Sequence, residues 1–440
     1  MRVAGPVAIV LLSVIGLASP SLGQGDGQTI GGQLRVEDDT GERVPVEGVL
    51  VTIDGQGEAV SDAEGRWSIA VSEPGTYTVV LDATTLPDAV SLRDSERGAL
   101  DMLVEAGQSK TALFALTTGD VGAPADEGEG ITGRRVAQLT VEGLKQGLYL
   151  AMAAIGLSLI FGTTGLVNFA HAELVTWGGL TTFFFNYYGL AGVLGFLAPL
   201  PGPFGDGVNL ILAAVFGMIS GGLLGYALDR FLFRGMRRDG VSLIAQMVIT
   251  IGLSILMRYF FLYNFGGNPR FFQDFASQRA MSIGPVEITP KDLAAMAVSI
   301  AILLLVGALL QLTRIGKAMR AVADNRDLAE SSGIDVERII GMVWTAGAAL
   351  AALGGVFFGL DQVRWDFGFR ILLLIFAAVV LGGLGTAYGA LVGAIVVGLA
   401  INLSTLFIDA ELKNMVALLV LVTILLVRPQ GILGRPERVG

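Results

Sequence analysis

Hydrophobic and polar positions follow three different patterns along the 440-residue chain. Between residues 28 and 116, short segments alternate strictly, with a large apolar residue at every second position, as in residues 49–53. Such alternation gives a strand one buried face. From Val136 onward the apolar runs are long and continuous, whereas residues 117–133 show no periodicity. The pattern therefore predicts a β-rich part, a tether and a helical part.

The alternating region predicts a small all-β sandwich domain. The alternation recurs in residues 67–71 and 77–81, and Gly, Asp and Pro residues that favour turns stand between the predicted strands. Several short strands at this spacing are typical of sandwiches. Residues 60–67 and 75–77 resemble carboxypeptidase regulatory-like, transthyretin-type sandwich modules. That resemblance implies no catalysis.

The continuous apolar runs predict membrane-spanning helices. Such runs cross about 30 Å of hydrocarbon, and the Gly and Ala residues that dominate them allow close helix packing in lipid. The apolar residues 190–200 are interpreted as a re-entrant or surface segment. The expected spans are residues 137–160, 166–188, 208–229, 242–263, 292–312, 339–360, 371–383, 388–407 and 413–428. The predicted fold is a polytopic α-helical membrane protein of about nine spans, some of them broken, preceded by a small all-β sandwich domain.

Composition supports the membrane assignment and excludes several kinds of chemistry. Of the residues 53% are hydrophobic and 15% charged, against roughly 25% charged in soluble proteins, and the mean hydropathy is +0.67. The absence of cysteine and the single histidine exclude disulfides, thiol catalysis and Cys- or multi-His metal sites. No phosphate-binding loop of the GxxxxGK(S/T) type occurs. We therefore expect no catalytic residues, no metal and no cofactor, with any ATP hydrolysis on separate partner subunits.

The N-terminus has the pattern of an export signal. Arg2 precedes an apolar run over residues 7–18, and small and turn-forming residues follow. A retained first membrane anchor is the alternative, and both interpretations place the next domain outside the cytoplasm. The expected organisation is a signal peptide (1–23), an extracytoplasmic β-sandwich domain (24–116), a flexible linker (117–135) and a transmembrane domain (136–440).

The charge distribution predicts the orientation of the spans. Residues 24–133 contain 21 Asp and Glu against 6 Lys and Arg, a net −15, whereas residues 134–440 contain 18 against 22, a net +4. Loops 230–241 and 313–338 and the tail from Arg428 onward carry 12 Lys and Arg, against 8 in the segments expected on the other side. The positive-inside rule therefore predicts a multi-pass membrane protein with a cytoplasmic C-terminus.

Charged and polar residues interrupt the expected spans at two kinds of place. Lys145 and Arg258 lie near the outer ends of their spans, where snorkelling explains them and lining a solute path is the alternative. The second span begins with Asn168, His171 and Glu173, and polar groups inside hydrocarbon usually face a cavity or a partner. An interhelical hydrogen-bond cluster is the alternative there.

The loop 313–338 predicts a short amphipathic helix between two spans. A small-residue face of this kind can dock into a groove of a partner, and an ordinary connecting loop is the alternative. Gly333 suits a helix C-terminus, and Asp335 can cap the following span. The small-residue face comprises Ala318, Ala321, Val322 and Ala329.

Glycines are dense between residues 381 and 393, where they interrupt an apolar region. Broken helices at membrane depth often line a cavity, and close helix packing is the alternative. Gly389 and Gly393 form a small-xxx-small pair. The tail at 427–434 is interpreted as a helix stop with a basic anchor.

These four segments, in this order, resemble the branched-chain amino acid permease family of bacterial ABC importers (the LivH type), over residues 137–434. The resemblance implies a pore subunit that pairs with a second related permease. It also implies two cytoplasmic ABC ATPases that dock on loop 313–338 and an extracytoplasmic solute-binding protein that delivers the solute. The chain departs from the family at Ala172, where glycine is usual, and in its outer domain.

The residues expected to act follow from the four segments and the resemblance. The ATPase-coupling residues are Gly316, Ala318, Arg320, Ala321, Asp324, Asn325, Ala329 and Gly333. The residues of the translocation path or helix break are Asn168, Phe169, His171, Glu173, Gly382, Gly383, Gly385 and Gly389.

The expected function is import of branched-chain or related amino acids, with urea or short amides as the alternative solutes. A secondary transporter would need inverted repeats and clustered carboxylates in its spans, which the sequence lacks. A membrane-tethered sensor needs one or two anchors rather than about nine spans.

Overall fold

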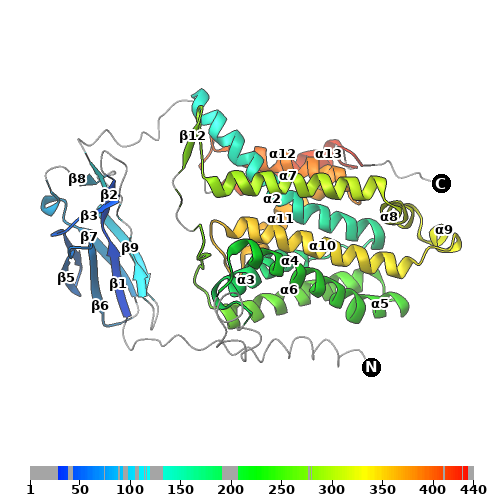
Figure 1. Cartoon of the computed structure of the whole chain (residues 1–440), viewed down its shortest axis with the longest axis horizontal. Coiled ribbons are helices and arrows are strands. Elements are labelled where there is room, and N and C mark those ends of the chain that lie inside the picture. Colours follow the sequence, from blue (N-terminus) through cyan, green and yellow to red (C-terminus); the bar gives the residue numbers. More distant parts are fainter. Residues whose placement is uncertain are drawn as a thin grey trace. The chain divides into compact units, whose positions relative to one another are not determined.

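The computed structural model describes residues 28–37, 43–73, 75–87, 90–92, 98–104, 109–112, 114, 116–118, 132–190, 207–275, 278, 280–409, 412–428 and 430–434. The chain divides into two compact units, Ser19–Gly130 and a second that contains Ile131–Gly440 (Figure 1). The expected signal peptide 1–23, linker residues 119–131 and the apolar residues 191–200 lie outside the described residues.

The N-terminal unit consists of small β-sheets. Its described strands are β1 (Gln28–Gln33), β2 (Arg35–Glu37), β3 (Arg43–Pro45), β4 (Leu50–Ile53), β5 (Gly57–Val60), β6 (Arg66–Val71), β7 (Gly75–Leu81), β8 (Val90–Leu92), β9 (Ala99–Val104), β10 (Ser109–Thr111) and β11 (Leu116–Thr118). The largest sheet is antiparallel, in the order β5-β4-β7-β9. A three-stranded sheet has the order β10-β1-β6, with β1 and β10 parallel, and β11-β8 and β2-β3 form two further pairs.

The alternation in the sequence corresponds to buried and exposed faces of these strands. Val51 of β4 lies opposite Leu81 of β7, and both side chains are buried. In β6, Trp67, Ile69 and Val71 are buried while the residues between them are exposed. The prediction of half-buried strands is therefore confirmed, since one face of each of these strands supplies the core of the unit.

The second unit is a bundle of helices with one small hairpin (Figure 1). The helices are α2 (Gly133–Thr164), α3 (His171–Tyr188), α4 (Leu210–Leu228), the π-helical η4 (Asp229–Phe233), α5 (Arg234–Arg238), α6 (Leu243–Phe265), α7 (Pro290–Leu312), α8 (Arg314–Asp324), α9 (Arg326–Ser331), α10 (Val336–Gly359), α11 (Phe367–Gly382), α12 (Ala387–Ser404) and α13 (Lys413–Val427). Strands β12 (Met281–Ile283) and β13 (Val286–Ile288) form the hairpin before α7.

Six of the described helices are long and apolar enough to cross a membrane. They are α2, the continuous helix from α4 to α5, α6, α7, α10 and α12. α11 and residues Met415–Val427 of α13 are apolar but shorter. The fold is thus a polytopic helical membrane protein with about six clear candidate spans, fewer than the nine expected from the sequence.

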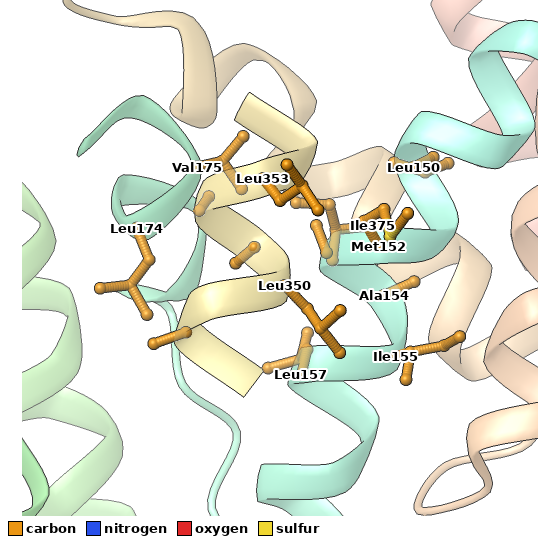
Figure 2. Close-up of a cluster of buried hydrophobic side chains, with 14 of the residues drawn as sticks. Leu150, Met152, Ala154, Ile155, Leu157, Leu174, Val175, Leu350, Leu353 and Ile375 are labelled. Carbon is orange, nitrogen blue, oxygen red and sulfur yellow. The ribbon is translucent and has the colours of Figure 1, made fainter. Parts of the chain in front are cut away.

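The core of the bundle lies where α2, α3, α10 and α11 meet. Figure 2 shows Met152 and Leu157 of α2 beside Leu350 and Leu353 of α10, with Ile375 of α11 close to Met152. These side chains are at most 8% exposed and belong to one continuous apolar cluster. α2 and α10 are also the most buried of the candidate spans. They form the rigid centre against which the other helices pack.

Glycine allows the closest approaches in this core. A Cβ at Gly156 of α2 would collide with the carbonyl oxygen of Gly347 of α10, and one at Gly178 of α3 with that of Ala352. Helices in lipid associate largely through such close packing. Burying an apolar side chain between helices gives no hydrophobic gain there, because lipid tails are equally apolar. The small-xxx-small pair has the same role: Gly389 and Gly393 bring α12 against α11.

We predict opposite effects for two glycine substitutions in helices. Gly178→Ala should lower the free energy of unfolding by about 1–3 kcal/mol, since the new methyl group meets backbone rather than a movable side chain. Gly252→Ala in α6 has open space around it and should be neutral or stabilising by up to about 1 kcal/mol. Thermal melting in detergent measures both. Equal melting temperatures for the two variants would contradict the packing argument.

Candidate functional site

The bundle contains a break in its helices, between α2 and α3. α2 ends at Thr164, and Gly165 has a left-handed backbone (φ 69°) whose N–H donates to the carbonyl of Phe161 at 2.7 Å. Glycine is favoured there because other residues rarely adopt this conformation. The following residues are not helical until α3 begins at His171. The segment 165–170 therefore reverses the chain direction inside the bundle.

The break returns the chain to about the middle of the bundle's depth. At the start of α7, Asp292 pairs with Lys145 of α2 (3.3 Å), and the last turn of α7 lines one cavity with Gly162 of α2. α7 is long enough to cross about 30 Å of hydrocarbon. The Nε2–H of His171 donates to the carbonyl of Ala153 (3.0 Å), which lies midway between Lys145 and Gly162. The N-terminus of α3, the positive end of its dipole, therefore lies at mid-depth.

Side chains of the break are held by α6. The backbone N–H of Phe169 donates to Thr250 Oγ1 (3.1 Å), and Ser254 Oγ donates to Glu173 Oε1 (3.0 Å). Asn168 Oδ1 accepts the N–H of the residue two positions ahead, which stabilises the turn. The structure therefore brings Asn168, His171 and Glu173 together at one level of the bundle, while Phe169 turns its ring towards Phe376 of α11.

Several buried polar atoms at this break have no hydrogen-bond partner among the described residues. They are Asn168 Nδ2, His171 Nδ1, Glu173 Oε2 and Arg258 Nε. Buried polar groups are normally paired, because each unpaired one costs about 1–3 kcal/mol. These atoms could accept or donate hydrogen bonds to water or a solute, and similar unpaired buried atoms occur elsewhere in the described residues, for example in Ser299 and Trp344.

Lys145 and Arg258 each have a carboxylate partner on another helix, which the sequence did not predict. Lys145 forms its ion pair with Asp292. Arg258 Nε lies 3.6 Å from Glu173 Oε1, and its guanidinium stacks over Phe369 with Cζ 3.7 Å from the ring centroid. Both charges are neutralised by partners on other helices, and such pairing replaces part of the lost hydration.

The glycine-rich segment forms a tight turn between α11 and α12, beside the end of α2, and shares a cavity with Gly165 at the start of the break. Gly383 and Gly385 have positive φ (113° and 78°). Gly382 and Gly389 bring the two helix backbones into contact, and Gly385 lies against Gly162 at the end of α2. The structure therefore places these four glycines at the end of the bundle where α2 ends, apart from Asn168, His171 and Glu173.

The C-terminal tail completes the end of α11. The N–H groups of Ile432 and Leu433 donate to the carbonyls of Leu381 and Gly382 (2.8 and 2.9 Å). The last carbonyls of a helix have no partner within the helix, so the tail supplies donors that α11 lacks. Sequence reasoning had interpreted this tail as a basic anchor and missed its capping role, which depends on a contact between distant segments.

We predict that Gly431→Ala destabilises this closure. Gly431 has φ 79°, and a Cβ there would lie 2.6 Å from the nitrogen of Gly383. The strain and the clash together should cost on the order of 2–3 kcal/mol in unfolding free energy. Gly333→Ala is the control, because Gly333 has φ 84° but open space and should lose only about 1 kcal/mol. A melting temperature of Gly431→Ala at or above that of Gly333→Ala would contradict the contact.

The expected single helix in loop 313–338 is two helices, α8 and α9. Asn325 separates them: it is extended (φ −159°), ends α8 and accepts the N–H of Leu328 to begin α9. A residue with this side chain caps a helix better than it continues one, which the small-residue pattern did not reveal. Two local predictions are confirmed, since Gly333 has φ 84° after α9 and Asp335 caps α10 by accepting the N–H of Arg338.

The small-residue face of this loop is turned inward, contrary to expectation. Val322 and Ala329 are buried, and Ala318 and Ala321 pack against the apolar core of the bundle. The exposed face instead carries Arg320 with Ile315 and Leu328, which are 49% and 65% exposed. A partner protein would therefore meet charged and large apolar side chains rather than the alanines.

A cavity of about 650 Å³ lies beneath α8. Arg320 and Asp324 of α8 line it together with Gly385 and Gly389 of the glycine turn and Thr163 of α2. Two segments that the sequence singled out separately thus meet at one cavity. Gly316 does not line it; it is buried where α8 follows α7.

An ionic cluster that sequence reasoning missed fixes the same end of the bundle. Glu337 of α10 accepts from Arg237 (2.8 Å) and Arg326 (2.7 Å), and Arg234 lies 3.4 Å away. Arg237 also pairs with the buried Asp229 at 2.7 Å. The cluster joins η4 and α5 to α9 and α10. The sequence shows only that Arg and acidic residues gather at these helix ends, which does not identify the pairs.

The fold and these sites define a multi-pass membrane transport protein without a nucleotide-hydrolysing site of its own. The profile of the family described as "Branched-chain amino acid transport system / permease component" matches residues 139–425. Because the match covers more than half of the chain, the chain belongs to this family. It is a permease component, a non-catalytic transmembrane subunit of a transport system.

Individual relatives agree with the family. The chain is 30% identical over 308 residues to the high-affinity branched-chain amino acid transport system permease protein LivH of Salmonella typhimurium, covering 68% of this chain and 96% of that protein. It is 26% identical to the LivM permease protein of Escherichia coli, covering 64% and 68%. PsaBC from Streptococcus pneumoniae in complex with Fab aligns at 12% identity over 66% of this chain and 91% of that chain, with a TM-score of 0.34, too low to bear on the fold.

Proposed function

We propose that this chain is a pore subunit of a binding-protein-dependent ABC importer for branched-chain amino acids. The observation that carries the proposal is the similarity to a permease named for this solute class, which covers 96% of that permease. The break at mid-depth supports it, because a solute path through hydrocarbon needs polar groups and irregular backbone at the centre of the membrane.

The proposed topology has nine crossings, with α3, α11 and α13 as short ones beside the six clear spans. α3 and α11 both begin inside the bundle, where the N–H of Gly368 donates to Thr176 of α3. The non-helical segment before each helix therefore makes up the rest of its crossing. Counting from an exported N-terminal unit, loops 230–241 and 313–338 and the C-terminus face the cytoplasm. The excess of Lys and Arg in those segments supports this orientation.

The proposed partners are a second related permease, two ABC ATPases and a solute-binding protein. α6 supports the first, because it packs mainly on α3 and leaves Ile244, Val248 and Tyr263 62–87% exposed. Loop 313–338 supports the second, because it projects the exposed face of α8 and α9 at the proposed cytoplasmic end. Asn325 and Asp324 lie at the joint between these two helices, where a docked ATPase would act on both.

The N-terminal unit is proposed to be an extracytoplasmic accessory, a transthyretin-type sandwich on a flexible linker. The alternating strands support it, as does the acidic composition of residues 24–133, which differs from that of the membrane part. A module that only gathers partners near the pore entrance would act by raising their local concentration.

Uptake measurements test the proposed function. The complex purified through this chain and reconstituted into vesicles should import leucine, isoleucine and valine in an ATP-dependent manner and should contain cytoplasmic ATPases. Labelled urea is the matched competitor on the panel. Import of urea without leucine would replace the amino acid proposal with its alternative, and ATP-independent uptake would contradict an ABC importer.

We predict that Arg320→Glu weakens the stimulation of ATP hydrolysis by the solute. Arg320 is exposed on α8, so reversing its charge changes the docking face; it also lines the cavity beneath α8 but is not part of the apolar core. Solute-stimulated ATPase activity of the assembled complex should fall by about tenfold, as expected for one interface residue worth about 1.4 kcal/mol. Arg230→Glu is the control, because Arg230 is exposed and lies outside loop 313–338. The ATPase activity of this variant should stay within about twofold of the wild-type value. Equal activities in the two variants would exclude Arg320 from the coupling surface.

A further inference from the structure

Arg258 is the most unusual charge in the bundle. It lies on α6, between apolar neighbours Ile255 and Tyr259 that are 47% and 63% exposed. Its side chain is 18% exposed, whereas its partner Glu173 is completely buried. The pair is loose, with 3.6 Å between Nε and Oε1, because Ser254 already donates to the same oxygen at 3.0 Å.

The guanidinium has more hydrogen-bonding capacity than this pair uses. An arginine presents five N–H donors in a planar fork. Among the described residues Glu173 is the one anionic partner of Arg258, and Nε makes no hydrogen bond. The face of the guanidinium stacks on Phe369, whose ring is 49% exposed. The stacking fixes the plane of the fork, and the 18% exposure of the side chain leaves part of the guanidinium accessible although Nε is buried.

The depth of Arg258 determines what this edge can meet. Ser254 is level with Glu173 in the first turn of α3, which begins at mid-depth, and Arg258 lies about one helical turn from Ser254. The hydrocarbon boundary is roughly 15 Å from the centre of a bilayer, so the backbone of Arg258 lies within the hydrocarbon. A guanidinium that faced lipid tails there would be costly. A polar path along its open edge would remove this cost.

We propose that Arg258 binds the carboxylate of the transported amino acid as it passes the centre of the membrane. A carboxylate accepts two parallel hydrogen bonds from the arginine fork, the strongest geometry for this pair. Glu173 is a positioning residue: it orients the guanidinium and balances its charge when no solute is bound. Phe369 holds the plane of the fork. The inference rests on the proposed import of amino acids and gives the pore itself a preference for acids over neutral amides.

Charge-neutral substitutions separate recognition from structural pairing. Arg258→Gln in the reconstituted complex should lower maximal leucine uptake by at least about tenfold, the effect of losing one partner of a desolvated charge pair. The double variant Glu173→Gln with Arg258→Gln removes both charges of this pair, so neither partner is left unpaired. Its uptake should remain equally low. Arg258→Lys keeps the charge but loses the fork, so its uptake should lie in between.

The control is Arg370→Gln, because Arg370 directly follows Phe369, is 59% exposed and pairs with Asp366 instead. Its uptake should stay within about twofold of the wild-type rate. If Arg258→Gln fails to assemble because Glu173 is left unpaired, the double variant carries the comparison. Each complex is first shown to elute and melt as the wild type does.

The outcomes distinguish this inference from the proposed function. Leucine uptake at the wild-type rate by the double variant would show that Arg258 only neutralises Glu173, and would overturn carboxylate binding while leaving amino acid import intact. A wild-type complex that imports urea but no amino acid would overturn both. Leucine uptake by Arg258→Lys at the full wild-type rate would also count against a bidentate contact between the guanidinium and the carboxylate.

Discussion

The structure depends on the need of every backbone group in hydrocarbon to find a partner inside the protein. Regular helices satisfy this need by themselves, but a chain that stops being helical at mid-depth does not. At the break after α2, the N–H of Phe169 is satisfied by Thr250 from another helix, and at the start of α11 the N–H of Gly368 is satisfied by Thr176. Each irregular segment thus requires a neighbour that is fixed in place. The glycine contacts between α2, α3 and α10 provide that fixed frame.

The buried charges follow the same logic. Lys145, Arg258 and Arg237 each have a carboxylate partner on a different helix (Asp292, Glu173 and Glu337), so these ion pairs form only when the helices have assembled. Removing one partner leaves an uncompensated charge, which costs more than the pair contributes. The ion pairs therefore specify which helices are neighbours more than they add to stability. The Arg258–Glu173 pair is costly to bury, because both groups lose their hydration.

Local features could be predicted from the sequence, and long-range ones could not. Alternation located the strands, and the cap at Asp335 and the turn at Gly333 were predictable because they involve residues within one turn of each other. The partners of Lys145 and Arg258 were not, since Asp292 and Glu173 are distant in the sequence. The inward direction of Ala321 was missed for a similar reason: the pattern shows that a face exists but not which neighbour covers it. The number of spans was hardest to predict at α3 and α11: both helices begin inside the bundle, and α11 has only 16 residues.

The joint at Asn325 has a mechanical consequence. α8 contacts α2, α7 and α10, whereas α9 contacts α10 and is tied to α5 through Arg326, Glu337 and Arg237. A single rigid helix would carry any displacement to all of these helices together. Two short helices joined at an extended residue can move relative to each other. The part of a displacement that reaches α2 and α7 through α8 therefore need not equal the part that reaches α5 through α9.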